Sequence, residues 1–304
     1  MPGTYFGPYN EQYSSYAHGG NANLGRYPLG HTLILPDGRE YKFTLNDGTV
    51  EVAGSLYQSV APVTGHTNVV SAAAAIGATA ISGTMSATAA AVDIYSEGAV
   101  HVNDATGEGY SYRIRRAMTA GAAHAAAAST GTLTVNLAAG ESVQVALDTT
   151  SELTFSRNRY HQATIHGSPP TATLTGVSPG VAAASRFYWS QTKGYAAVLC
   201  NLTLLAGLPV QADIATDGAV ENYKRRVRTT GTTVLFVTTG LWGVTLSDQD
   251  GGALAGLYAI ASTNAIAPAT YDISGGVAYN APIVGMCVKA NASTEFALID
   301  LNII

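Results

Sequence analysis

The chain has little charge. Only 12% of its 304 residues are Asp, Glu, Lys or Arg, about half of the roughly 25% that soluble domains usually carry. Charged side chains normally cover the surface of a free soluble monomer. A chain that lacks them is expected to be covered by other chains, either copies of itself or a partner lattice. The composition therefore favours an assembly protein over an enzyme.

Cysteines are also scarce. Cys200 and Cys287 each lie within an apolar run, so we expect two buried free thiols. The N-terminus has neither the basic nor the apolar region of a signal peptide. The uncharged stretch over residues 68–92 is mostly Ala, Ser, Thr and Gly, which predicts no membrane-spanning helix. The net charge of −5 gives no general reason to expect nucleic acid or an anionic membrane as a partner.

The sequence lacks the common catalytic motifs. It contains no Gly-x-Ser-x-Gly, His-Glu-x-x-His, P-loop or dinucleotide-binding motif. On a strand, His161 and His166 would point to opposite faces, which argues against a shared metal ion. The Asp-x-Asp-Gly run that begins at Asp248 looks like part of a calcium loop, but its twelfth position is Ala259 rather than Glu. We therefore predict no enzyme, cofactor, metal ion or small-molecule substrate.

What the sequence does contain is a dense series of strand and turn signals. The Asp-Gly pairs at 37–38 and 47–48 supply the positive φ angles of tight turns, so a three-stranded meander is expected at 32–35, 40–45 and 49–52. Further strands are expected at 77–85, 132–135, 142–147, 162–166, 187–189, 196–199, 233–237 and 296–301. An apolar run followed by Ala-Gly, a hydrophobic residue and Gln occurs at 49–58 and again at 201–211, which would fit two related β modules.

Breaks in this pattern predict the domain organisation. Pro169-Pro170 and the Gly- and Pro-containing segment 176–180 mark the expected boundary. The prediction is a mainly β protein with few short helices. An N-terminal extended arm over residues 1–28 is followed by two small antiparallel β domains, sandwich- or barrel-like, at 29–170 and 171–304.

The N-terminal segment is unusually aromatic. Its aromatic side chains alternate with Gly, Pro, Asn and Ser, a composition that cannot form a core alone. Tyrosine gives a large contact area at low entropic cost, which suits an arm that lies across a neighbouring subunit. The alternative, a tail that packs on its own domain, is equally open. The candidate interface residues are Tyr5, Phe6, Tyr9, Tyr13 and Tyr16.

Seven of the 15 Lys and Arg residues lie in two short runs. On a strand, Lys224, Arg226 and Arg228 would share one face. Such a row could bind an acidic partner surface or, less readily in an acidic chain, phosphate. The alternative is a solvated strand face with weak local ion pairs. We favour an interface role for these three residues and for Arg113, Arg115 and Arg116 of the other run.

Five segments follow one another in a characteristic order: Leu35-Pro36-Asp37-Gly38-Arg39, Val52–Gln58, Phe187–Tyr195, Leu205-Ala206-Gly207 and Pro282–Val288. Their order resembles the capsid decoration, or cement, proteins of tailed bacteriophages, especially those of cyanobacterial and other aquatic phages. The first two segments are similar to the opening β module of that family, and the three later ones are similar to its second module and its ending.

The resemblance implies a function for the chain. A protein of this family is β-rich and often a homotrimer, and it lies on the outer surface of an icosahedral head after synthesis in the host cytoplasm. There it clamps neighbouring major capsid subunits against internal DNA pressure without catalysis. The expected partners are therefore copies of the chain itself and a major capsid protein.

Two other interpretations stay open at this point. The first is a phage tail, fibre or spike component that binds host glycan or protein, which would expose aromatic residues such as Trp189, Trp242 and Tyr271. The second is a hydrolase or lyase on a β scaffold. Its candidate carboxylates are Asp217, Asp248 and Asp250.

Overall fold

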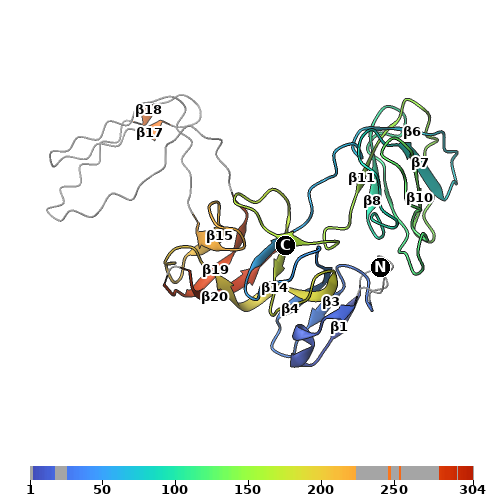
Figure 1. The fold of residues 1–304 in the computed structure, drawn as a ribbon. Helices are drawn as coiled ribbons and strands as arrows, with labels where there is room; N and C mark the ends of the chain where they lie inside the picture. Colours follow the sequence, from blue (N-terminus) through green and yellow to red (C-terminus); the bar gives the residue numbers. More distant parts are fainter. Residues whose placement is uncertain are drawn as a thin grey trace. The chain divides into compact units, whose positions relative to one another are not determined.

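The computed structural model of the chain describes residues 3–17, 26–223, 246–247, 253–254, 281–292 and 294–303. The chain divides into two compact units, one of Met1–Tyr223 with Ala281–Ile304 and one of Lys224–Asn280. The described residues of the second unit form β17 (Leu246–Ser247) and β18 (Ala253–Leu254), which pair antiparallel. The expected strand at 233–237 lies outside the described residues. All other described strands belong to the first unit (Figure 1).

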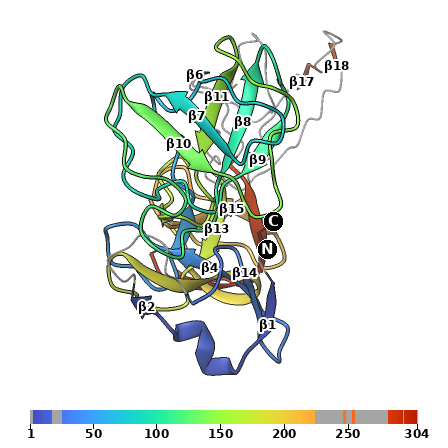
Figure 2. The same ribbon diagram turned by 90° about the vertical axis from the view of Figure 1, so that its right-hand side faces the viewer.

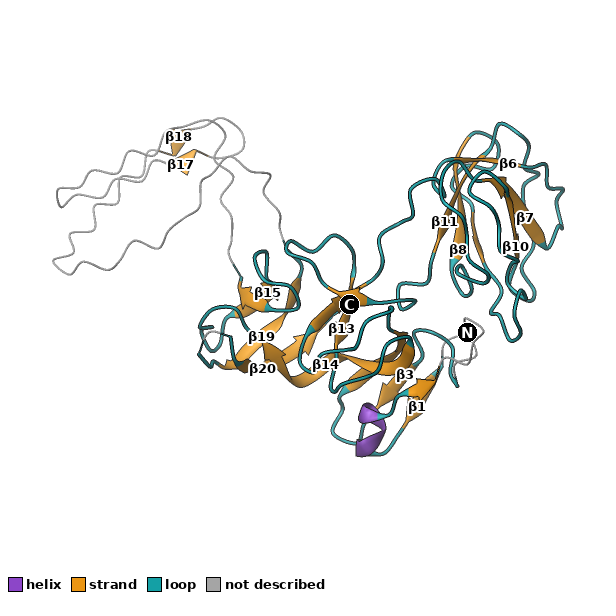
Figure 3. Cartoon of the chain, in the orientation of Figure 1, coloured by secondary structure: helices purple, strands orange, loops and turns teal. Residues whose placement is uncertain are grey.

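The first unit is built almost entirely of strands and loops (Figure 3). Across the described residues, the one helical element is the short 3-10 helix η1 (Tyr9–Tyr13). The strands form a twelve-stranded sheet and a six-stranded sheet. The predicted mainly β class is therefore confirmed.

The twelve-stranded sheet joins both ends of the chain. Its main path runs in the order β1 (Thr4–Phe6), β3 (Thr32–Ile34), β4 (Glu40–Leu45), β14 (Arg186–Leu199), β20 (Phe296–Asn302), β19 (Ile283–Lys289), β15 (Pro209–Ala212) and β16 (Val220–Asn222). Four short strands pair beside this path: β2 (Tyr16–Ala17), β5 (Leu56–Gln58), β12 (Thr164–Ile165) and β13 (Leu174–Val177). β14 is the central element, because it pairs antiparallel with β4 and with β20.

The six-stranded sheet lies between β5 and β12 in the sequence and is wholly antiparallel. Its order is β10 (Thr132–Asn136), β7 (Ala80–Thr84), β6 (Val69–Ser71), β11 (Glu152–Ser156), β8 (Ala99–Asp104) and β9 (Ser111–Arg113), and Figure 2 shows these strands side by side. One face of the sheet covers its own core, in which Tyr95, Tyr112 and Phe155 pack among aliphatic side chains. The strands alternate buried and exposed residues, as expected for a sheet with one solvated face.

The twelve-stranded sheet covers two further cores, and β14 contributes to both. Its first half places Phe187 and Trp189 in an aromatic core with Phe43, which stacks on Phe187 at a centroid distance of 5.1 Å. Its second half places Ala196 and Val198 in an aliphatic core. The sequence predicted two separate strands here, at 187–189 and 196–199, whereas the structure has one continuous strand of 14 residues.

The expected domain boundary does not coincide with the sheets. β3, β4 and β5 belong to the expected first domain at 29–170, yet they pair in one sheet with β13 and β14 of the expected second domain at 171–304. The six-stranded sheet forms a separate module over residues 69–156, which lies between β5 and β12 in the sequence. The Pro-rich segment near 170 is a connection within one sheet, because β12 and β13 on either side of it both pair with β5.

The meander is confirmed in its first two strands. β3 and β4 form an antiparallel hairpin, and Gly38 in the turn has a φ of +85°. The third expected strand, at 49–52, is wrong. Asp47 Oδ1 accepts a hydrogen bond from the Thr49 amide at 2.7 Å, and the Glu51 amide donates to the carbonyl oxygen of Ala182 at 2.8 Å. The chain therefore turns away to contact a distant loop instead of pairing with β4.

Other strand predictions differ in outcome. The expected strands at 132–135 and 296–301 are β10 and β20, and β7 lies within the expected 77–85. Of the expected strand at 162–166, only residues 164–165 form β12. The expected strand at 142–147 is wrong. There, the amides of Val143 and Leu147 donate to the carbonyl oxygens of Ala78 and Ala74, whereas the Gln144 amide donates to the Tyr112 hydroxyl.

The two similar sequence segments share a local structure. In each, a turn that ends in a glycine with positive φ, Gly54 at +75° and Gly207 at +81°, leads into a short strand. The glutamines that follow, Gln58 and Gln211, are both buried. The sequence similarity at 49–58 and 201–211 thus corresponds to one turn–strand unit used twice.

Candidate interaction surfaces

The described part of the predicted arm packs on its own sheet. β1 pairs in parallel with β3, and β2 pairs antiparallel with the start of β14. Tyr5 and Tyr16 pack against the aromatic core, where Tyr16 lies 5.8 Å from Phe43 between ring centroids. Of the two alternatives that the sequence left open, the structure has the tail that folds back on its own domain.

Three aromatic residues of this segment remain exposed. Phe6 is 76% exposed at the end of β1, and Tyr13 is 65% exposed at the end of η1, with Tyr9 between them. Together, Phe6, Tyr9 and Tyr13 form what we call the N-terminal aromatic surface. Isolated exposed aromatics are common, but three within eight residues of one segment are typical of a contact surface.

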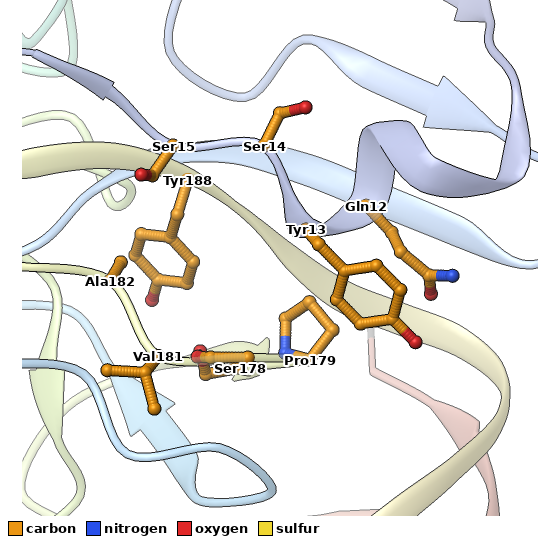
Figure 4. Close-up of a pocket in the computed structure, with 10 residues that line it drawn as sticks. Gln12, Tyr13, Ser14, Ser15, Ser178, Pro179, Val181, Ala182 and Tyr188 are labelled. Carbon is orange, nitrogen blue, oxygen red and sulfur yellow. The ribbon is translucent and has the colours of Figure 1, made fainter.

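A small pocket lies beside this surface. Figure 4 shows Tyr13 near Pro179, with Tyr188 deeper between the segments 12–15 and 178–182 that line the pocket. The pocket has room for about one water molecule. Complete burial raises the pKa of Tyr188 well above its usual range. A pocket of this size does not fit a substrate, and Tyr188 serves as part of the wall.

A buried carboxyl group lies close to the pocket. Glu51 is only 2% exposed, and it lies near Tyr57 and Tyr188. Burial raises the pKa of Glu51 to about 8, whereas hydrogen bonding from Tyr57 and Asn46 lowers it by less. The amide next to it, of Val52, donates to the Tyr57 hydroxyl at 2.8 Å. The carboxyl group is therefore largely protonated at neutral pH.

Of the candidate carboxylates of the hydrolase interpretation, the structure describes Asp217. His161 and His166 are both buried, and the ring nitrogens of His166 lie 2.9 Å from the carbonyl oxygen of Gly167 and 2.8 Å from that of Ala219. Asp217 accepts a hydrogen bond from the Ser168 hydroxyl at 2.7 Å on the surface. Over the described ranges, no three His, Cys, Asp or Glu side chains form a group that could hold a metal ion. Asp248 and Asp250 lie outside those ranges.

The aromatic residues of the host-binding interpretation are likewise not exposed where the structure describes them. Trp189 is fully buried, because β14 directs it into the aromatic core between Phe43 and Tyr27. The expectation of an exposed Trp189 is therefore wrong. Trp242 and Tyr271 lie outside the described residues.

The residues of the basic run at 113–116 have two different environments. Arg113 on β9 and Arg115 just after it are exposed, whereas Tyr112 and Ile114 point into the core. Arg116 instead forms an ion pair of 2.9 Å with the buried carboxylate of Glu97. That carboxylate also accepts a hydrogen bond from the Leu29 amide at 2.8 Å, so Arg116 has a structural partner. The second run, Lys224, Arg226 and Arg228, lies outside the described residues.

The sequence reasoning missed an apolar face on the twelve-stranded sheet. β20 alternates strictly, so Ala297, Ile299 and Leu301 are buried while Phe296 and Leu298 are exposed. Neighbouring strands add more exposed apolar side chains on the same face. We call this surface the apolar sheet face: Tyr195, Met286, Val288, Phe296 and Leu298.

A signal for this face was present in the sequence. Four consecutive apolar residues, Phe296 to Ile299, put hydrophobic side chains on both faces of one strand. A strand with one solvated face would alternate with polar residues instead. Cys200 and Cys287 are both buried and free, as predicted.

Comparisons with known proteins gave no match. No family model matches the chain, no curated protein is significantly similar to it, and no solved structure matches its fold. Within the ranges that the structure describes, no helix is long and apolar enough to cross a membrane.

Proposed function

We propose that this chain is a virion structural protein, an outer capsid decoration or cement protein that stabilises a phage head by clamping neighbouring major capsid subunits. The observation that carries the proposal is the presence of two exposed apolar surfaces on one sheet. The N-terminal aromatic surface lies on the edge strand β1 and on η1, which packs against the first half of β14, and the apolar sheet face lies on the second half of β14, β20 and β19. A clamp built from several copies needs at least two attachment surfaces, one for the capsid protein and one for copies of the chain.

The proposed mechanism is distributed over the surface. Burial of exposed apolar side chains supplies the binding free energy, at about 25 cal/mol per Å² of apolar area removed from water. Tyr9 and Tyr13 offer rigid rings with a polar hydroxyl, which suits a partly wet protein interface. Arg113 and Arg115 supply charged contacts that fix orientation on an acidic partner surface. The partners in this proposal are copies of the chain and a major capsid protein, on the outer surface of the head.

Electron cryomicroscopy of the native particle tests the proposal. The expected result is density for this chain on the outer shell, repeated with the symmetry of the head. Density on the tail or a fibre would instead support the host-binding interpretation. A particle that lacks the chain altogether would contradict both.

The N-terminal aromatic surface gives a sharper test. Tyr9→Ser combined with Tyr13→Ser should weaken attachment of the purified protein to heads that lack it by at least tenfold, or about 1.4 kcal/mol. Occupancy is measured by co-sedimentation of protein with heads. Tyr110→Ser removes a comparably exposed tyrosine from the six-stranded module and serves as the matched control. Equal loss in both variants would contradict a role for the N-terminal surface.

A further inference from the structure

The outer face of β20 and β19 has an ordered arrangement of four side chains. The strand register places Leu298 opposite Lys289, and Asp300 opposite Met286. All four side chains are exposed. They therefore occupy the corners of a quadrilateral, with Asp300 and Lys289 at one pair of opposite corners and Leu298 and Met286 at the other pair.

Apolar side chains surround and fill this quadrilateral. On β14, Tyr195 lies opposite Asp300 and is 58% exposed, and Ala197 lies opposite Leu298. Met286 is 47% exposed, and Val288 lies beside it on β19. An apolar patch that is continuous across three strands marks a contact surface rather than ordinary solvent-facing sheet.

The two charges at the corners lack partners within the sheet. Neither Asp300 nor Lys289 belongs to the three ion pairs that the described residues form. A two-fold axis in the plane of the face, along the diagonal from Met286 to Leu298, would exchange the other two corners. Asp300 of each copy would then meet Lys289 of the other, and Leu298 and Met286 would each meet their own counterparts.

From this juxtaposition we infer that the outer face of β14, β20 and β19 binds the same face of a second copy of this chain about a two-fold axis. A face that carries one acidic and one basic corner across an apolar diagonal is complementary to itself, whereas a uniformly acidic or basic partner would repel one of the two corners. This inference depends on the sheet face alone and not on the proposed capsid role. It predicts an even number of copies, whereas the resemblance implies three.

Thiol cross-linking tests the geometry on the axis. Leu298→Cys with a short bismaleimide reagent should give a covalent dimer, with mass spectrometry identifying position 298 joined to itself. The native thiols of Cys200 and Cys287 are buried, so the unsubstituted protein is the control and should give no dimer. Recovery of monomer alone, with position 298 alkylated by one end of the reagent, would show that the two copies of this position do not meet, and would overturn the inference.

Charge reversal tests the corners. Asp300→Lys alone and Lys289→Asp alone should each weaken dimerisation at least tenfold in analytical ultracentrifugation, because like charges then face each other. The double variant restores opposite charges and should recover most of the affinity. Glu108→Lys changes an exposed carboxylate on the six-stranded module and should have no effect. Circular dichroism confirms that each variant is folded. A monomer at all concentrations, a trimer, or no recovery in the double variant would overturn the two-fold contact.

Discussion

Glu51 shows how a single residue can reverse the pattern that its neighbours suggest. In the sequence, Val50 and Val52 flank Glu51, so alternation predicts buried valines and an exposed carboxylate. The structure has the opposite: both valines are exposed and Glu51 is buried. The cause is the amide of Glu51, which donates to the carbonyl oxygen of Ala182, more than 100 residues away. A partner at that separation leaves no local trace in the sequence.

This buried carboxyl group should make stability depend on pH. The pKa of Glu51 is about 8 in the folded chain and near 4.5 when exposed, so the folded state holds a proton that the unfolded state releases between those values. The contribution of this proton to the free energy of unfolding is fully present below about pH 4.5 and is lost as the pH rises through about 8. Glu51→Gln is neutral at every pH, and should therefore have a flatter dependence of melting temperature on pH between 5 and 8.5, with a higher melting temperature than the native chain at pH 8.5.

A control variant separates the effect of Glu51 on the melting temperature from the effects of the other titrating groups. Glu108→Gln, which changes an exposed carboxylate, should retain the pH dependence of the native chain. Thermal melting followed by circular dichroism measures all three proteins. If Glu51→Gln and the native chain melt with the same pH dependence, the carboxyl group is not protonated in the folded state.

The turn–strand units at Gly54 and Gly207 allow a matched test at the level of one element. Both glycines have positive φ, so replacing either with alanine adds a strain of roughly 1–2 kcal/mol. A side chain at Gly54 would also clash with the ring of Phe296, whereas one at Gly207 would meet open space. Gly54→Ala should therefore lower the free energy of unfolding clearly more than Gly207→Ala.

Urea denaturation measures this difference. Phe296→Ala removes the ring from above Gly54, so in that background the two glycine substitutions should have similar effects. A larger loss for Gly207→Ala would show that the contact between the turn and β20 is weaker than the structure indicates.

The elements that could be predicted from the sequence are those made by neighbouring residues. The β3–β4 hairpin was predictable because its turn carries Asp37-Gly38, and β20 because Phe296 to Ile299 form a continuous apolar run. The expected strand at 142–147 has an equally apolar sequence, but its amides donate to a loop and to the Tyr112 hydroxyl. Alternation predicts that a segment is half-buried, and it does not identify which backbone groups are its partners.

At the scale of the whole molecule, the two thiols report on unfolding. Cys200 and Cys287 are buried, and burial raises the pKa of both, so neither should react with a disulfide reagent in the native protein. Both should react in step with the loss of circular dichroism as urea is added. Rapid reaction of one thiol without urea would instead reveal local opening of β19 or of the end of β14.

The organisation of the molecule and its contact surfaces were less predictable than its class. Dense strand and turn signals were sufficient for the mainly β class. The boundary near residue 170 was not supported by the sheets, because the proline signal marks an irregular connection whether or not a new domain follows it. Of the predicted interface residues, Phe6, Tyr9 and Tyr13 are exposed, whereas Tyr5 and Tyr16 contribute to the aromatic core. Whether one of these side chains is exposed depends on which face of its short element points towards the aromatic core.

The pairing of β14 also sets the order in which the protein can fold during synthesis. β14 needs β4, which is made earlier, and β20, which is made later, so the twelve-stranded sheet cannot close until β20 has been synthesised. The six-stranded sheet uses only residues 69–156 and can form while the ribosome is still elongating. The edge of β14 that pairs with β20 must therefore stay without its partner strand until β20 emerges, in a chain with few charges to oppose association with other chains.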